Sequence, residues 1–428
     1  MMPRPHSRLV MKFGGTSVAD MTRIRRAAEL VAAEVKAGKA VAVVVSAMAG
    51  VTNQYVTWTD VAGPPAPGLG DGEDEYDVVV SSGEQVTAGL MTMVLRNLGV
   101  ASRSWLGWQV PIHTDTGHGH ARITGVEADT LGPAIDQGVV AVVPGFQGLG
   151  ADGRITTLGR GGSDTTAVAL AAALHAPCDI YTDVDGVYTT DPRVEPKARR
   201  LAQVCYPEML EMAAMGAKVL AARAVELAYA HQVPVRVLSS FSEPGQPRGG
   251  TWILNEDQIM EHRLVSAVAH SLDEAKVTLR HLPDHPGTAA RIFDALGAAD
   301  INVDMIVQAR SEAQARADLA FSVGRRDARK AMNAVKAAQE AIGFSEVLLD
   351  EGVAKVSVIG VGMRSHAGVA QTLFATLAAQ KINVQAISTS EIKISVLVDE
   401  AQAESAVKAL HAAYGLAEVS TQNCAATP

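Results

Sequence analysis

A glycine turn that runs directly into a helix-forming segment stands near the middle of this chain, reading TLGRGGSDTT at residues 157–166 and AVALAAAL at residues 167–174. The apolar segment contains strong helix formers and no Gly or Pro, so it predicts a helix with Ser163 or Asp164 as its N-cap. Glycines let backbone N–H groups approach an anion, and a helix start adds the positive end of its dipole. Arg160 and Asp164 flank this cradle and suit it to anion and metal handling, although a loop that merely begins a helix would look similar.

Strands and helices alternate through the first two-thirds of the chain. Apolar and β-branched runs predict strands at residues 9–13, 40–45, 77–80, 139–143, 179–182 and 235–238, with 252–254 as a candidate edge strand. Helices are predicted at residues 21–36, 86–98 and 207–232, the first with Asp20 as N-cap and Gly38 past its end. Continuous apolar strands between helices indicate an α/β fold with a mostly parallel sheet covered on both faces.

Polar and glycine clusters follow these predicted strands, at the edge where ligands bind in such sheets. They are Gly14-Gly15, Ser46, the SSGE run at residues 81–84 and the PGF run at residues 144–146. Lys12 stands at the end of the first strand, where an ammonium group is costly to bury unless an anion compensates it. The chain has no G-x-x-x-x-G-K-[ST] and no G-x-G-x-x-G motif, so neither familiar nucleotide fingerprint applies.

Composition narrows the class of protein. A chain of 428 residues with 48% hydrophobic and 19% charged residues is typical of a soluble globular protein with several domains. The net charge of −9 argues against nucleic acid as a partner. No apolar run predicts a membrane span or a signal peptide. Three scattered cysteines suit a reducing cytoplasm and predict neither disulfides nor a metal site. The pair His118 and His120 has no Cys or carboxylate nearby in sequence, which favours a polar loop.

The last third of the chain is an internal repeat. The tripeptide AKV occurs at residues 275–277 and 354–356, and the tripeptide INV at residues 301–303 and 382–384. Each copy reads as strand, glycine loop, amphipathic helix and strand, and the helices are predicted to bury Ile292, Phe293 and Leu296, then Leu373, Phe374 and Leu377. Asp284 and Asn302 fall at strand–loop junctions where a small ligand could dock, although two lids without a ligand are the plainer alternative.

Five motifs, taken in order, resemble the signatures of aspartokinases, a family of the amino-acid kinase superfamily. They are KFGGTSV (residues 12–18), SAMAGVTN (46–53), SGE (82–84), GRGGSD (159–164) and YTDVDGVYTTDPR (181–193). The repeat resembles the tandem ACT domains of the same family, so the resemblance covers nearly the whole chain. It implies a three-layer αβα kinase domain at residues 1–248, with ferredoxin-like ACT domains at residues 249–345 and 346–428.

The resemblance implies ATP-dependent phosphorylation of the side-chain carboxylate of L-aspartate, with Mg2+, as the first step towards lysine, threonine and methionine. Lys12 and Asp164 would be the catalytic residues. The substrate would be held by Ser46, Thr52, Glu84, Phe146, Arg160, Gly161, Gly162 and Ser163. The nucleotide would be held by Lys12, Phe13, Gly14, Gly15, Ser17, Thr182, Asp183, Tyr188, Asp191, Arg193 and Lys218. No protein metal site is implied.

By the same resemblance, lysine and threonine would be effectors. Their sites would use Asp284, Gly287, Asn302, Gln308, Val369, Asn383 and Ser390. The chain would form a homo-oligomer, or an α2β2 assembly with a shorter ACT-only product for which Met260 is a suitable start. Two features resemble the subgroup that makes such a product. The segment between Asn53 and Tyr76 is short, and Ala221-Ala222 stands where many aspartokinases have His-Pro.

Several alternatives stay open at this point. Glu84 could cap a helix, Asp183 and Asp185 could be turn residues, and Arg193 and Lys218 could be solvated charges. Within the superfamily, a kinase acting on glutamate, carbamate or a nucleotide is the nearest alternative, which SGE, Arg160 and the ACT repeat disfavour. An amino-acid-binding regulator with an inactive kinase region would require the loss of Lys12 or Asp164, and both are present.

Overall fold

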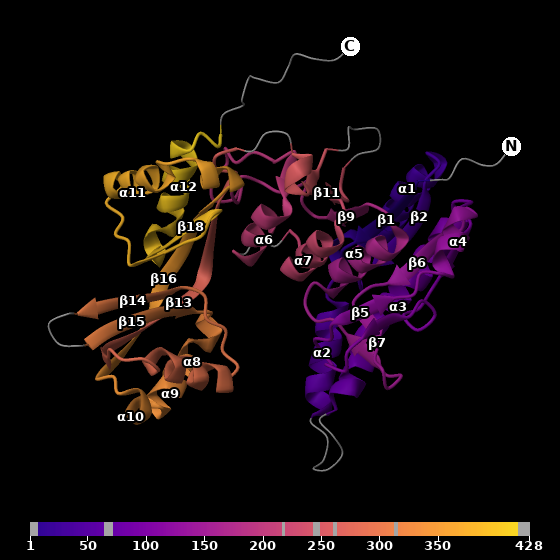
Figure 1. Ribbon diagram of the computed structural model, residues 1–428. Helices are drawn as coiled ribbons and strands as arrows, with labels where there is room; N and C mark the ends of the chain where they lie inside the picture. Colours follow the sequence, from indigo (N-terminus) through magenta and orange to yellow (C-terminus); the bar gives the residue numbers. More distant parts are fainter. Residues whose placement is uncertain are drawn as a thin grey trace. The chain divides into compact units, whose positions relative to one another are not determined.

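The computed structural model describes residues 7–63, 72–215, 219–242, 249–259, 263–311 and 316–417 (Figure 1). Their contacts form two compact units. The first comprises the described parts of Met1–Val187, Arg200–Ala213 and Lys218–Met260, and the second those of Tyr188–Arg199, Ala214–Ala217 and Glu261–Pro428. Lys218, Met260 and most of the Pro/Gly-rich loop after Gly63 lie outside the described residues.

An eight-stranded sheet forms the centre of the first unit, in the order β10-β12-β11-β9-β1-β2-β6-β3. Every neighbouring pair is parallel except β11 with β12, which confirms the mostly parallel sheet. The strands are β1 (Arg8–Phe13), β2 (Ala40–Val45), β3 (Ser102–Ser104), β6 (Val140–Pro144), β9 (Cys178–Thr182), β10 (Gln203–Cys205), β11 (Val235–Ser239) and β12 (Thr251–Leu254). Since β12 pairs inside this sheet, the predicted domain boundary at residue 248 falls within the first unit.

Helices lie on both faces of the sheet because its strands are apolar on both. Leu9, Met11 and Phe13 of β1 join a core with α1 and α3, while the alternate residues, including Lys12, face α5. The helices of this unit are α1 (Met21–Lys36), α2 (Val51–Ala62), α3 (Glu73–Asn97), α4 (Leu131–Asp136), α5 (Gly162–Leu174), α6 (Tyr206–Ala214) and α7 (Ala222–His231), with 3-10 turns η1 (Gly15–Val18) and η2 (Glu256–Gln258). As predicted, Asp20 caps α1 by accepting from the Arg23 N–H at 2.8 Å, and Gly38 follows it with φ 84°.

A smaller four-stranded sheet, in the order β5-β4-β7-β8, leads into the glycine turn. Its strands are β4 (Ile112–Thr114), β5 (Ile123–Val126), β7 (Gln147–Leu149) and β8 (Ile155–Thr157). The turn after β8 has φ 74° at Gly159 and 76° at Gly161, which is the N-cap of α5. The predicted cap at Ser163 or Asp164 was therefore wrong: both residues lie inside the first turn of the helix, because glycine can take the left-handed conformation that turns the chain here.

The strand predicted at residues 77–80 was also wrong, because these residues belong to α3. The β-branched run suggested a strand, but three acidic residues in the first turn favour a helix start, and a buried face runs along the helix through Asp77, Val80, Ser81 and Glu84. Among the described residues, α3 is the helix long and apolar enough to cross a membrane by length and composition. More than half of its apolar window is buried against the core instead.

The single helix predicted at residues 207–232 is two helices, α6 and α7. The segment between them contains residues outside the described part of the chain, and Ala221, with extended backbone, precedes α7. Helix propensity continues across this segment, so sequence reasoning had no Pro or paired Gly to mark the break.

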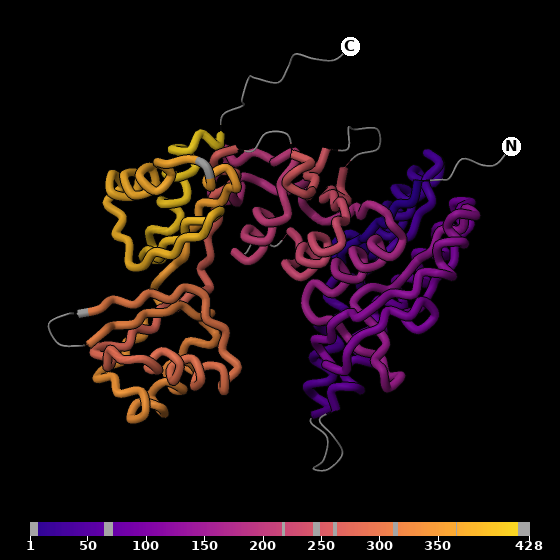
Figure 2. Tube along the Cα trace, in the orientation of Figure 1, coloured from indigo at the N-terminus to yellow at the C-terminus, as the bar shows by residue number. Residues whose placement is uncertain are grey.

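The second unit is built on a six-stranded antiparallel sheet in the order β14-β15-β13-β16-β18-β17, whose chain path can be followed in Figure 2. The strands are β13 (Ala267–Pro283), β14 (Ile306–Ser311), β15 (Arg316–Val323), β16 (Glu346–Ile359), β17 (Ala386–Thr389) and β18 (Lys393–Asp399). The helices are α8 (Thr288–Ala298), α9 (Ala328–Ala337), α10 (Gln339–Ile342), α11 (Val369–Ala379) and α12 (Ala403–Ala413), with 3-10 turns η3 (Arg325–Asp327), η4 (Val361–Ser365) and η5 (Glu400–Gln402).

The two repeat copies interleave in this sheet rather than follow one another. The first half of β13 pairs with the second half of β16, which in turn pairs with β18. The second half of β13 lies between β15 and the first half of β16. Two separate apolar cores result, one around Ile292 and Leu296 and one around Leu373 and Leu377. The helix faces predicted from the repeat are thereby confirmed, with Phe293 and Phe374 half-buried. The predicted boundary at residue 345 therefore separates β13 from β16, although each copy of the repeat contains part of both strands.

Candidate functional site

A pocket of about 320 Å3 opens at the carboxyl ends of β1, β2 and β6. It brings together the predicted catalytic pair and every predicted substrate residue: Lys12, Asp164, Ser46, Thr52, Glu84, Phe146, Arg160, Gly161, Gly162 and Ser163. These residues come from segments far apart in the sequence, and the parallel sheet gathers them because its strands end at one edge. Ala47, Met48, Ala49, Gly50 and Asn53 of the loop after β2 also line it.

Lys12 and Asp164 form an ion pair in this pocket, with Nζ and Oδ1 2.5 Å apart. Lys12 is the last but one residue of β1, and Asp164 lies in the first turn of α5. Each residue is only 8% exposed, so neither charge is well solvated and each depends on the other. The other carboxylate oxygen of Asp164 accepts from the Ala221 N–H at 3.4 Å. The pair leaves a fixed cation at the strand end, next to the glycines.

Gly14 and Gly15 bring the backbone close to this cation. A Cβ on Gly14 would lie 3.3 Å from the Lys12 Nζ, and one on Gly15 would lie 3.1 Å from the Ala47 carbonyl oxygen. A side chain at either position would therefore press on the pocket wall. The two glycines keep open a space into which an anion can approach Lys12 and the backbone.

Glu84 reaches the pocket from α3 and is nearly buried, at 3% exposed. Its Oε1 accepts from the Ala47 N–H at 3.0 Å, whereas its Oε2 is buried and has no hydrogen-bond partner among the described residues. Burial raises the pKa of Glu84 to about 7, although the hydrogen bond from Ala47 opposes the shift. An unsatisfied buried carboxylate oxygen is costly, and a cationic ligand would relieve it.

Arg160 is the opposite kind of group. Its side chain is exposed at the pocket, and it makes no hydrogen bond or ion pair within the part of the chain that the structure describes. A guanidinium that faces a pocket without an internal partner is suited to grip a carboxylate through two N–H groups. Apart from the paired Lys12 and Asp164, the pocket thus offers one cation, Arg160, and one anion, Glu84, as recognition of a zwitterion requires.

Phe146 carries backbone strain that sequence reasoning did not find. Its φ is 70°, a left-handed conformation that is rare for an aromatic residue, and its N–H donates to the Thr166 Oγ1 at 3.1 Å. The preceding Gly145 cannot carry a side chain, because a Cβ there would lie 2.7 Å from the Ser163 Cβ. The surrounding contacts hold this turn against α5, and strain of this kind concentrates at binding sites.

The predicted nucleotide residues are less well gathered. Phe13 is buried and stacks on Tyr181 with ring centroids 4.8 Å apart, and the Ser17 hydroxyl lies 2.8 Å from the Ser240 hydroxyl inside the protein. Thr182 ends β9 and donates to Asp183 at 3.1 Å. Tyr188, Asp191 and Arg193 belong to the second unit, where Arg193 and Asp191 form an exposed ion pair at 2.7 Å.

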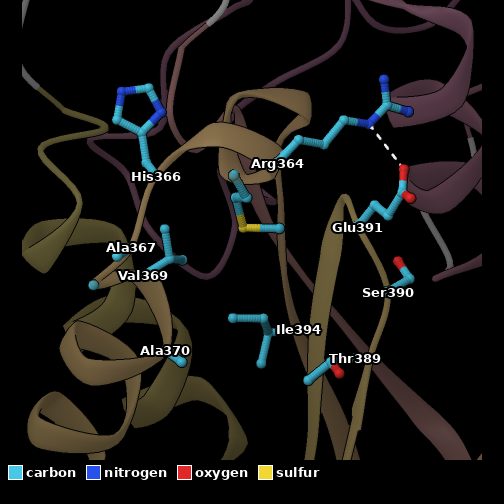
Figure 3. Close-up of a pocket in the computed structure, with 11 residues that line it drawn as sticks. Arg364, His366, Ala367, Val369, Ala370, Thr389, Ser390, Glu391 and Ile394 are labelled. Carbon is cyan, nitrogen blue, oxygen red and sulfur yellow. Dashed lines mark ion pairs between the residues drawn. The ribbon is translucent and has the colours of Figure 1, made fainter.

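Two further pockets lie at corresponding positions of the repeat. One of about 170 Å3 is lined by Asp284, Gly287 and Gln308, and one of about 550 Å3 by Gly368, Val369 and Ser390 (Figure 3). Asn302 and Asn383 line neither of these pockets. They lie in the irregular segments that follow α8 and α11.

Each repeat pocket has an ion pair beside it, with the charges reversed. In the first, Asp284 on the loop pairs with Arg310 of β14 at 2.5 Å. In the second, Arg364 of η4 pairs with Glu391 after β17 at 3.3 Å, as the dashed line in Figure 3 marks. The two sites are therefore related by the repeat but differ in electrostatics.

Comparisons with known proteins agree with the division of the chain into two units. Residues 7–239 match the model of the amino acid kinase family, and residues 280–339 and 356–414 match that of the ACT domain. The aspartate kinase of Pseudomonas putida is 49% identical over 411 residues, which covers 95% of this chain and 97% of that protein.

Two solved structures share the fold at 30% identity. E. coli aspartokinase III in complex with aspartate and ADP (R-state) covers 95% of this chain and 99% of its own, with a TM-score of 0.78. The same enzyme in complex with lysine and aspartate (T-state) covers 94% and 98%, with a TM-score of 0.74.

Proposed function

This chain belongs to the aspartokinase family, and on that premise we propose that its pocket transfers the terminal phosphoryl group of ATP to the side-chain carboxylate of L-aspartate. The observation that carries the proposal is the convergence of the Lys12–Asp164 pair, Glu84 and Arg160 on one pocket. The complex of E. coli aspartokinase III with aspartate and ADP supports this choice of ligands. The free, buried Cys178 and Cys205 suit the expected cytoplasm.

Phosphoryl transfer to a carboxylate requires stabilisation of negative charge rather than a general base. The attacking carboxylate is ionised near neutral pH, so no group has to remove a proton. The difficulty is that an anion attacks a polyanion, and cations or backbone donors must offset the charge on the transferring group. Lys12, fixed by Asp164 and approached through Gly14 and Gly15, supplies that charge. Glu84 holds the substrate ammonium and Arg160 its α-carboxylate.

Magnesium fits this site as a companion of the nucleotide. Within the described residues, no group of three or more His, Cys, Asp or Glu side chains is placed to hold a metal ion. Mg2+ in kinases is held largely by substrate phosphates, and Asp164, which pairs with Lys12, would orient the magnesium-bound phosphates. When bound, the ion would offset phosphate charge.

We propose that the nucleotide binds along the same edge of the sheet, beside Lys12. Thr182 ends β9 and Asp183 follows it, next to β1, where a nucleotide can extend from Lys12 along the sheet edge. By the family motif, Tyr188, Asp191 and Arg193 would also bind the nucleotide, together with Lys218, which lies outside the described residues. For Phe13 and Ser17, whose side chains are buried, any contact with ATP would go through the backbone.

The pH dependence of aspartate binding tests the role of Glu84. Because the pKa of Glu84 is raised to about 7, falling pH protonates it and removes the charge that would hold the substrate ammonium. We expect the KM for aspartate to rise below pH 7, approaching about tenfold per pH unit, with little change between about pH 7.5 and 8.5. Steady-state kinetics across this range, repeated with Glu84→Gln, would check it. An unchanged slope in Glu84→Gln would assign the titration to another group.

Arg160→Ala tests the substrate grip. Loss of a charged hydrogen-bonding partner is equivalent to about 1.5–3 kcal/mol, so the KM for aspartate should rise roughly 10- to 100-fold while that for ATP stays nearly constant. Turnover should also fall if this contact aligns the attacking oxygen. The control is Arg154→Ala, whose exposed guanidinium pairs with Asp74 and Glu75 away from the pocket. If ATP affinity fell instead, Arg160 would belong to the nucleotide site.

Regulation is proposed for the repeat, with lysine and threonine acting at the pockets that carry Asp284 and Ser390. E. coli aspartokinase III has been solved in complex with lysine, which supports lysine as one effector. Each pocket offers both charges in the ion pair beside it, which suits a free amino acid. Pairing of repeat units between chains, as a homo-oligomer or with a shorter product, would complete the sites with Asn302 and Asn383.

Activity with and without effectors tests this scheme. Coupling between such sites is usually worth about 1–3 kcal/mol, so lysine, threonine or both at millimolar concentration should raise the KM for aspartate roughly 5- to 150-fold. Asp284→Ala should weaken the effect, and Glu346→Gln, at an exposed ion pair of the same unit, should not. Full activity with every effector combination would leave the repeat as an assembly module.

A further inference from the structure

Asp77 is a fully buried carboxylate outside the pocket, and neither the family motifs nor the substrate residues account for it. It is 0% exposed and lies on α3, seven residues before Glu84 and on the same buried face. A carboxylate in such a place is destabilising unless several donors satisfy it. In the part of the chain that the structure describes, the donors that satisfy Asp77 come from two segments far away in sequence.

The first segment is the loop that contains the two histidines. The His118 Nδ1 lies 2.8 Å from the Asp77 Oδ2, and the Gly119 N–H donates to both carboxylate oxygens at 3.1 and 3.2 Å. The second segment is the end of β8. The Thr157 N–H donates to the Oδ2 at 2.9 Å, and the Thr157 hydroxyl donates to the Oδ1. One side chain therefore ties α3 to the loop and to the residue that enters the glycine turn.

Arg160 lies three residues after Thr157, and its own side chain has no internal partner in the described chain. Its position in the pocket thus depends on how the backbone of the turn is held. Asp77 holds that backbone at Thr157. On the other side, Arg223 of α7 donates to the Leu158 carbonyl at 2.9 Å and to the Ala121 carbonyl at 2.6 Å.

The loop and the turn also fit closely against each other. The Ala121 N–H donates to the Thr157 carbonyl at 2.9 Å, and a Cβ on Gly159 would lie 3.1 Å from the Gly119 carbonyl oxygen. A shift of the loop would therefore move the turn. The hydrogen bonds to Asp77 set the position of both at once.

We propose that Asp77 is a positioning residue that sets substrate affinity by holding the turn that carries Arg160. The inference rests on the proposed function, since Arg160 must grip the substrate for its position to matter. Asp77 does not line the pocket. Its negative charge, shared among donors from the loop and from β8, fixes the distance between α3, which carries Glu84, and the turn, which carries Arg160. Arg160 and Glu84 are thereby held at a fixed distance from each other.

The test is a double-mutant cycle between Asp77→Asn and Arg160→Ala. Asp77→Asn keeps the shape of the side chain but places an amide where donors converge, so the KM for aspartate should rise on the order of 10-fold or more. The KM for ATP should stay within about twofold. In the Arg160→Ala background, Asp77→Asn should have little further effect, because the group that it positions is gone. The matched control is Glu75→Gln, an exposed carboxylate on the same helix.

Thr157→Val keeps the proposal testable if Asp77→Asn does not fold. It removes the hydroxyl that donates to Asp77 but leaves the backbone N–H in place, so we expect a smaller rise in the KM for aspartate of roughly threefold, again lost with Arg160→Ala. Effects that add in the cycle, or a parallel rise in the KM for ATP, would overturn the inference and leave Asp77 with a purely structural role. A wild-type enzyme that phosphorylates no aspartate would overturn the proposed function itself, and the inference with it.

Discussion

Replacing Lys12 with Ala is expected to lower turnover by a factor on the order of 10² to 10³, as removal of one donor that stabilises transition-state charge typically does. Lys12 is the cation fixed at the strand end by Asp164, beside the two glycines through which phosphate would approach. The KM values for ATP and aspartate should change much less than turnover. Steady-state kinetics with both substrates varied would measure this.

The control for this prediction is Lys36→Ala, which removes an exposed ammonium at the end of α1. Because Asp164 is also buried, Lys12→Ala leaves a carboxylate without its partner, so the variant should lose stability as well as turnover. Turnover is therefore compared at a temperature where circular dichroism shows both proteins folded. Near-normal turnover in Lys12→Ala would remove Lys12 from the catalytic machinery.

Replacing Arg236 with Ala is expected to lower the free energy of unfolding by about 3–5 kcal/mol, the usual cost of leaving a buried charge without its partner. Arg236 of β11 forms a two-point contact with Asp179 of β9, at 3.0 and 2.5 Å, and its guanidinium lies 4.8 Å from the Trp252 ring centroid. Asp179 is 0% exposed. Burial raises its pKa, and the contact with Arg236 opposes that rise.

Arg8→Ala provides a control of matched geometry. Arg8 makes the same two-point contact with Asp136, at 3.0 and 2.7 Å, but the two side chains are 30% and 44% exposed, so its loss should cost about 0–1 kcal/mol. Urea-induced unfolding of both variants and the wild type would measure the difference. Equal losses would show that burial does not set the strength of these pairs. A variant that replaces both Arg236 and Asp179 with apolar residues should recover much of the stability.

Much of the fold and the site follows from local pattern. Apolar runs between helices predicted five of the eight strands of the large sheet, with the edge strand β12 as a candidate, because a strand buried on both faces must be apolar throughout. Lys12 at a strand end indicated a buried ammonium that needs an anion, which favoured a phosphate ligand, and in the structure the Asp164 carboxylate is its partner. The repeat predicted its buried helix faces, because each copy needs an apolar stripe to cover its sheet.

The remaining features depend on contacts between distant residues. Residues 77–80 read as a strand, and their helix becomes evident only with the face that buries Asp77 against Thr157 and Glu84 against Ala47. Asp77 and Glu84 stand two turns apart, a spacing that would have indicated one helix face, but the β-branched run between them outweighed it. Glycine at the N-cap of α5 and the left-handed Phe146 follow from the close approach of this turn to its neighbours.

The sequence by itself therefore determined the kind of sheet, the repeat and the residues that meet at the pocket, because each leaves a periodic or motif-sized pattern in the chain. Only the tertiary structure decided how the copies of the repeat exchange strands and which buried charges hold the pocket together. Those features depend on pairs such as β13 with β16, and on the contact of Asp77 with Thr157, two residues that lie 80 positions apart in the sequence. The free energy of such contacts comes from desolvation and geometry, which no local pattern of residues encodes.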